Sequence, residues 1–79
     1  MTQQLLSLAS LTAGTSAIVR EFNLPPANQH RLMELGVLAG TRVELVRYAP
    51  LGDPVEIRVR GSNLTLPRQE AAQVMVSLA

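Results

Sequence analysis

The stretch that decides the fold is HRLMELGVLAG, residues 30–40, where two glycines follow a short amphipathic segment. Gly36 stands where a helix should end, because glycine adopts the left-handed conformation of a helix C-terminus without steric cost. Counted from Gly36, Leu32 and Val37 occupy the two positions that touch in a Schellman ending, and both are apolar. Gly40 fits the third position of a type II turn over LAGT. The stretch therefore predicts a helix, a stop, a tight turn and a strand.

Two other glycine motifs are excluded at this stretch. A phosphate-binding loop places its glycines before a helix, with Lys and Ser or Thr behind them. Here the glycines follow the helix, and the chain contains no Lys. A G-x-x-x-G motif for packing in membranes needs small apolar neighbours, whereas His30, Arg31 and Glu34 crowd the approach. The two glycines are therefore interpreted as structural.

Further elements can be predicted on both sides of this stretch. The helix is expected to run from about Ala27 to Leu35, with Leu32 and Leu35 on one face. Pro25 and Pro26 make the connector before it rigid. Alternating apolar residues predict strands at 16–22, 41–48, 54–60, 64–66 and 74–78, and Pro67 opens a helical turn that runs to about Gln73.

Local features of these strands favour a barrel. The apolar pattern of residues 41–48 slips by one residue after Leu45, which predicts a bulge or a bend. Gly61-Ser62 fits a type II′ hairpin turn. AGTSAIVR at 13–20 echoes AGTRVELVR at 39–47, which indicates one turn chemistry used twice to launch a strand. Five short, tightly connected strands predict a small closed or nearly closed barrel.

Composition limits the class of protein. The chain has 79 residues, so a single domain over 1–79 is expected, and 47% hydrophobic residues suffice for one core. The lack of Cys excludes disulfides, thiolate metal sites and cysteine nucleophiles. A net charge of +1 provides no strong attraction to nucleic acid or to anionic membranes. No apolar run is long enough to span a membrane and no signal peptide is recognised, so a cytoplasmic protein is predicted.

Several motifs together resemble one family. The chain contains LxxLxxG at 8–14, RLMELGVLAG at 31–40, APLGDP at 49–54, IRVRG at 57–61, LTLxxxEA at 64–71 and VMV at 74–76. With these motifs it resembles FeoA, the small ferrous iron transport protein A, along essentially its full length. The APLGDP loop and the L-G-x-x-x-G spacing are the most specific parts. Ala39 departs from the family, whose members often have Pro there, but Ala tolerates such a turn.

The resemblance implies both a fold and a role. The expected fold is mostly β: a small SH3-like five-stranded barrel with one short α-helix and one C-terminal helical turn. The implied role is a cytosolic accessory of ferrous iron uptake, which binds and modulates the cytosolic domain of FeoB, the membrane GTPase transporter. The membrane would be reached only through that transporter. The alternative is a regulatory SH3-like domain akin to the C-terminal domain of iron-dependent repressors, although no helix-turn-helix segment is recognised. A weak homo-oligomer is left open.

No catalytic constellation is recognised, so neither an enzyme nor a cofactor is predicted. His30 and Glu34 stand at i,i+4 on the helix and could share a divalent ion. Metal sites of the structural or catalytic kind usually need three or four protein ligands. The favoured interpretation is therefore a solvated helix face with a side-chain contact, and no metal site is predicted.

The arginines of the strands are interpreted as a charged barrel exterior. Glu44 and Glu56 alternate with them and are expected to balance them. A nucleic-acid surface would also need rings on which bases stack, and only Phe22 and Tyr48 are available. No nucleic-acid partner is predicted. The arginines in question are Arg42, Arg47, Arg58 and Arg60.

Exposed apolar residues are the remaining candidates for function. Grouped in one patch, such residues usually mark an interface in a small domain, although each alone could fill a local gap in the core. The scarcity of aromatic residues argues against a groove for polyproline peptides. The hypothesis is that FeoB is contacted by Leu24, Pro25, Pro26, Met33 and Leu51.

Overall fold

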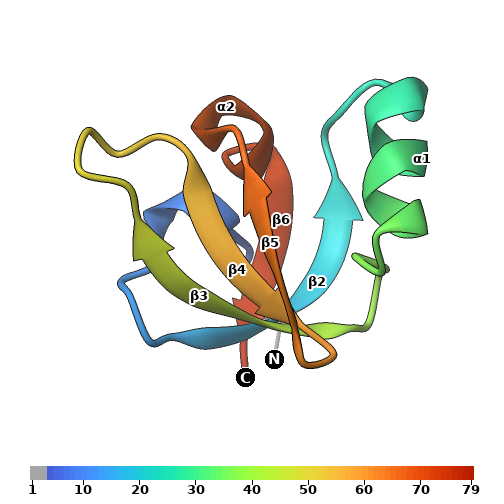
Figure 1. The fold of residues 1–79 in the computed structure, drawn as a ribbon. Coiled ribbons are helices and arrows are strands. Elements are labelled where there is room, and N and C mark those ends of the chain that lie inside the picture. The colour runs from blue at the N-terminus through green and yellow to red at the C-terminus, as the bar shows by residue number, and fades with distance from the viewer. Residues whose placement is uncertain (1–3) are drawn as a thin grey trace.

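Two short helices lie at one end of a strongly curved antiparallel sheet in the computed structural model, which describes residues 4–79 (Figure 1). The sheet order is β1-β6-β2-β3-β4-β5, and each neighbouring pair is antiparallel. The elements in chain order are β1 (Leu6–Ser7), the 3₁₀ helix η1 (Leu8–Ser10), β2 (Ser16–Phe22), α1 (Pro26–Glu34), β3 (Arg42–Tyr48), β4 (Val55–Val59), β5 (Ser62–Leu66), α2 (Arg68–Ala71) and β6 (Val74–Leu78). The predicted mostly-β fold is confirmed, and β1 and η1 are additions to it.

The helix ending at Gly36 has the predicted geometry. Gly36 adopts φ 98°, and its N–H donates to the Met33 carbonyl oxygen at 3.0 Å. The Val37 N–H donates to the Leu32 carbonyl oxygen, also at 3.0 Å. These two bonds define a Schellman ending. The chain therefore leaves α1 sharply and places Val37 against the core.

The echoed AGT segments are joined by a reciprocal set of hydrogen bonds. Each glycine donates to the strand that the other segment launches: Gly14 to Leu45 on β3 and Gly40 to Val19 on β2, both at 2.7 Å. Leu45 and Val19 donate back to the threonine carbonyl that follows the other glycine, both at 2.9 Å. The prediction of one turn chemistry used twice is confirmed, and the two turns close opposite ends of the β2–β3 ladder.

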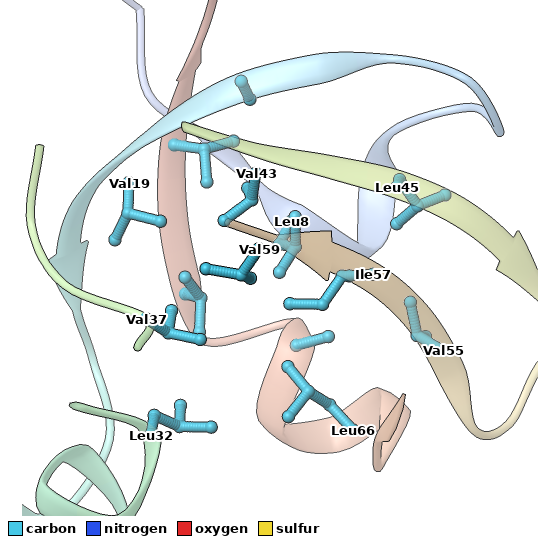
Figure 2. Close-up of a cluster of buried hydrophobic side chains, with 14 of the residues drawn as sticks. Leu8, Val19, Leu32, Val37, Val43, Leu45, Val55, Ile57, Val59 and Leu66 are labelled. Carbon is cyan, nitrogen blue, oxygen red and sulfur yellow. The ribbon is translucent and has the colours of Figure 1, made fainter. Parts of the chain in front are cut away.

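The core lies inside the curve of the sheet and includes one side chain of α1, Leu32. Figure 2 shows its side chains converging from the strands, from α1 and from the segment after it. A buried leucine or valine contributes roughly 1.5–3 kcal/mol, so this cluster is the main source of stability in a chain without disulfides. The largest fully buried side chains are Leu8, Leu32, Leu45, Ile57, Leu66, Val19, Val37, Val43, Val55, Val74 and Val76.

The structure corrects two details of the sequence analysis. Leu35 is 45% exposed instead of sharing the buried face of Leu32, because α1 ends at Glu34 and Leu35 belongs to its C-cap. The hairpin between β4 and β5 turns at Arg60 and Gly61, with φ 52° and 81°, and not at Gly61-Ser62. Positive φ at both central residues defines a type I′ turn in place of the predicted type II′ turn. The predicted bulge in β3 is confirmed between Leu45 and Arg47.

Candidate protein-interaction site

The loop of residues 49–54 presents Leu51 to solvent at the end of the molecule that also carries the helices (Figure 1). The Leu51 residue is 94% exposed. The Gly52 N–H donates to the Ala49 carbonyl oxygen at 2.7 Å, and the Ala49 N–H donates to the Pro54 carbonyl oxygen at 3.0 Å. Gly52 has φ 86°, which only glycine adopts easily. The backbone of the loop therefore closes on itself and leaves the leucine outside.

The loop is held in place by contacts with α2, which in turn contacts Tyr48 at the end of β3. The Asp53 Oδ1 accepts the backbone N–H of Arg68 at 3.0 Å. The Arg68 guanidinium lies 5.8 Å from the centre of the Tyr48 ring and fills the space beside Gly52, where a Cβ would stand 2.6 Å from its Nη1. Tyr48 in turn donates its O–H to the Ala9 carbonyl oxygen at 2.9 Å. The backbone of a loop held in this way is already ordered, so a partner that bound it would not have to order it.

The other predicted contact residues that reach solvent belong to α1 and its connector. Pro25 and Pro26 are exposed at the start of the helix. Met33 is 38% exposed, and Leu35, which is 45% exposed, adds further apolar surface. An ion pair between Arg31 and Glu70 ties α1 to α2. The exposed apolar residues Pro25, Pro26, Met33 and Leu35 at the two ends of α1 are together called the α1 surface.

Leu24 does not belong to either exposed surface. It is only 7% exposed and is part of the hydrophobic core. The connector is held against the molecule, because the Asn23 N–H donates to the Gln73 carbonyl oxygen at 2.8 Å. The Gln29 Nε2 donates to the Leu24 carbonyl oxygen at 2.7 Å. The expectation that Leu24 is exposed is therefore wrong, since these contacts turn the side chain inward.

The predicted contact residues do not form one patch. Figure 1 shows the 49–54 loop and α1 on opposite flanks of the same end, with α2 between them. A shallow groove separates α1 from α2, with Leu24, Pro25 and Pro67 among its lining residues. The braced loop around Leu51 is the more exposed of the two apolar surfaces. We therefore take it as the primary candidate site.

His30 and Glu34 form a contact on the exposed face of α1. The His30 Nδ1 lies 3.3 Å from the Glu34 Oε1, and both side chains are exposed. Residues 4–79 bring no third His, Cys, Asp or Glu beside them. The arrangement is the i,i+4 side-chain contact that the sequence predicted.

Two arginines of the strand exterior are balanced as predicted. The Arg47 Nε lies 2.7 Å from the Glu56 Oε1, and the Arg58 Nη1 lies 3.4 Å from the Glu44 Oε1. Asn63 also donates to Glu56, from its Nδ2 to Oε2 at 2.7 Å. The hydrogen bonds from Arg47 and then from Asn63 hold the pKa of the Glu56 carboxyl below its usual range.

A model of the FeoA domain family matches residues 6–78. The chain belongs to the FeoA domain family. Among solved structures, an FeoA protein from Chlorobium tepidum is 40% identical with a TM-score of 0.88, and the match covers 92% of this chain and 70% of that one. FeoA structures are SH3-like barrels, so the predicted SH3-like fold is confirmed. No helix within residues 4–79 is long and apolar enough to span a membrane.

Two further relatives bear on the role of FeoA domains. A protein of Porphyromonas gingivalis (strain ATCC BAA-308 / W83), named as a fusion of Fe(2+) transport protein A and Fe(2+) transporter FeoB, is 32% identical over 73 residues. That match covers 92% of this chain but 9% of the relative, so the chain spans about a tenth of that protein. A manganese-dependent transcriptional repressor matches all of this chain over 44% of its own, with a TM-score of 0.89 and 12% identity. At that identity the likeness concerns the fold alone.

Proposed function

We propose that this FeoA-family protein is a non-enzymatic, cytoplasmic accessory of ferrous iron uptake that binds the cytosolic domain of FeoB and modulates the transporter. The observation that carries the proposal is Leu51, 94% exposed at the tip of a braced loop. The fused relative supports it, because its name joins the two proteins in one chain. Members of the family are accessory transport proteins.

The energetics of the loop suit a protein contact. Removing a fully exposed leucine from water is worth roughly 1.5–3 kcal/mol. The hydrogen bonds within the loop and its contact with Arg68 exist before a partner arrives. The free energy gained by burying Leu51 is therefore not offset by an entropy cost of ordering the loop backbone. A leucine presented on a fixed turn is suited to fill a pocket on a partner.

The α1 surface is proposed as a second, weaker contact. Pro25 and Pro26 present fixed backbone, and the flexible thioether of Met33 adapts to irregular surfaces. The Met33 residue is less exposed than Leu51. The two surfaces flank α2 (Figure 1), so a partner that reached both would have to cover the helical end of the molecule.

Binding of the FeoB cytosolic domain to purified single variants tests the proposal, with and without guanine nucleotide. We expect Leu51→Asp to weaken binding by about tenfold or more, as truncation of a central interface residue does. Met33→Asp should have a smaller effect. Leu78→Asp is the matched control, because Leu78 is also an exposed leucine but lies at the end of β6.

Two results would contradict the proposal in different ways. Failure of the unaltered protein to bind the FeoB domain in any nucleotide state would remove the function itself. Unchanged binding by both Leu51→Asp and Met33→Asp, with native NMR spectra, would leave the function standing and remove the site. Equal losses with Leu78→Asp would show that added negative charge, and not the lost leucine, weakens the complex.

The alternative is a regulatory SH3-like domain akin to that of metal-dependent repressors. The structural match to the manganese-dependent repressor favours it as far as the fold is concerned. It predicts binding to the other domains of a repressor and no affinity for FeoB. The same binding experiment therefore separates the two functions.

A further inference from the structure

On the outer face of the β3–β4 ladder, the arginines at the end opposite the 49–54 loop have no carboxylate partner among the described residues, unlike those nearer the loop. Glu44 pairs in register with Arg58, and the next outward-facing positions along the two strands are Arg42 and Arg60. A groove passes over these residues, lined also by Ser16, Thr41 and Gly61. Figure 1 shows the β4–β5 turn at the end opposite the loop, and the seven residues of β3 span about 20 Å.

Charge is unbalanced only at this end of the ladder. Arg47 and Arg58 both have a carboxylate partner. Within residues 4–79, no ion pair involves Arg42 or Arg60, and both are exposed. The β3–β4 register ends with Val43 opposite Val59, so Arg42 and Arg60 come next at the adjacent ends of the two strands, and both line the groove. Two positive charges brought together without a carboxylate between them repel each other, so the pair is not explained by stability.

The backbone at Arg60 is a second, independent observation. Arg60 has φ 52° and is the only non-glycine residue with positive φ among residues 4–79. A type I′ turn favours Asn, Asp or Gly at that position. An arginine at position 60 is disfavoured for two reasons. Its residue type does not suit the backbone of the turn, and its charge is repelled by Arg42. A residue that is kept in an unfavourable conformation often serves a function. At this position the functional group is the guanidinium of Arg60.

We propose that this groove binds an acidic peptide segment of a partner protein, with its carboxylates on Arg42 and Arg60. The planar guanidinium donates two parallel hydrogen bonds to a carboxylate. Glu44 lies in the same groove and accepts a backbone N–H or a hydroxyl of such a segment. This surface is distinct from the 49–54 loop, so the inference goes beyond the proposed function and does not depend on it.

A peptide fits the groove better than a nucleic acid does. The Glu44 carboxylate repels a continuous row of phosphates. No aromatic ring is among the lining residues, so bases would have nothing on which to stack. The net charge of +1 adds no long-range attraction to a polyanion. The groove offers Arg42 and Arg60, without a carboxylate partner in the part of the chain that the structure describes, beside Arg58, which is paired with Glu44. This arrangement matches a chain that carries both hydrogen-bond acceptors and donors.

An NMR titration of the full chain with a hexaglutamate peptide at about 0.1 M salt, where the screening length is about 10 Å, tests the inference without FeoB. We expect the largest shifts at the amides of Arg42, Arg60 and Gly61 and at the Nε signals of the two arginines. Arg60→Gly removes the guanidinium and suits the turn, so it should weaken binding by about tenfold while the melting temperature is no lower than before. Arg42→Gln should weaken binding similarly.

Arg47→Gln is the matched control, because it removes the same charge from a paired position on the same face. It should leave hexaglutamate affinity within about twofold of the unaltered protein, as expected for a screened distant charge. Equal losses with Arg47→Gln, or no shifts at Arg42 and Arg60, would overturn the site. Tighter binding of oligothymidylate or inorganic phosphate than of hexaglutamate at these residues would overturn the assignment to an acidic peptide.

Discussion

The connector before α1 and the 49–54 loop both place a leucine beside proline, yet Leu24 is 7% exposed and Leu51 is 94% exposed. The connector's hydrogen bonds reach other parts of the molecule, including the Gln73 carbonyl oxygen. The loop's own backbone bonds, at Gly52 and Ala49, return within the loop. In these two segments the burial of the leucine follows the destination of the backbone hydrogen bonds and not the local composition.

Truncating each leucine is the sharpest way to test this contrast. Leu24→Ala should lower the free energy of unfolding by about 2–5 kcal/mol, because it removes buried methyl groups and leaves a cavity. Leu51→Ala should change it by less than about 0.5 kcal/mol, as is usual at an exposed site. Urea denaturation of both variants provides the measurement. Similar losses of unfolding free energy in Leu24→Ala and Leu51→Ala would contradict the assignment of one leucine to the core and the other to the surface.

A smaller effect is expected at the contact that fixes the loop to α2. Asp53→Ala removes the acceptor of the Arg68 N–H and should cost about 1 kcal/mol of unfolding free energy, in the range of a lost helix cap. Asp53→Asn keeps an oxygen acceptor and should retain most of the stability. Thermal denaturation measures both. If Asp53→Ala lowers FeoB affinity while Asp53→Asn does not, the bracing of Leu51 is shown to matter for binding.

The smallest effect concerns how the unfolding free energy depends on pH through Glu56 on β4, the strand that follows the loop. The pKa of Glu56 is lower in the folded chain than in the unfolded one, so the unfolded state binds more protons in acid. Its contribution to stability is present above the unfolded pKa, about 4.3, and is lost as the pH falls through the lower folded pKa. Glu56→Gln should therefore flatten the dependence of unfolding free energy on pH in this window. An unchanged profile in that variant would contradict the role of the Arg47 and Asn63 bonds.

Features set by local rules were predictable from the sequence. Alternation at Val55, Ile57 and Val59 located β4 and its buried face, because side chains along a strand point to opposite sides. Gly36 and the apolar pair Leu32 and Val37 gave the end of α1, because the Schellman ending depends only on neighbouring residues. The bulge in β3 was visible as a slip in the apolar pattern.

Features that depend on contacts distant in the sequence were not predictable. The two residues of β1 are ordered by pairing with β6, and the burial of Leu24 rests on contacts that include Gln73. The hairpin turn was misplaced because Arg60 adopts a conformation that its residue type disfavours.

The candidate site was predictable in part. APLGDP pointed to an exposed apolar loop, and Leu51 in it is 94% exposed. Nothing in the pattern assigned roles to Tyr48, Asp53 or Arg68, since their contacts join segments that only the folded chain brings together. That Arg42 and Arg60 line one groove becomes apparent once the register of β3 and β4 is known.

The reciprocal bonds of the two AGT segments have a consequence for how the protein folds. Each glycine N–H finds its acceptor on a strand from the other half of the chain, so neither half alone can make these bonds. We expect the molecule to fold and unfold in one cooperative, all-or-none step, because each half supplies hydrogen-bond acceptors to the other. A cut between α1 and β3 should therefore yield two fragments that regain structure only when mixed.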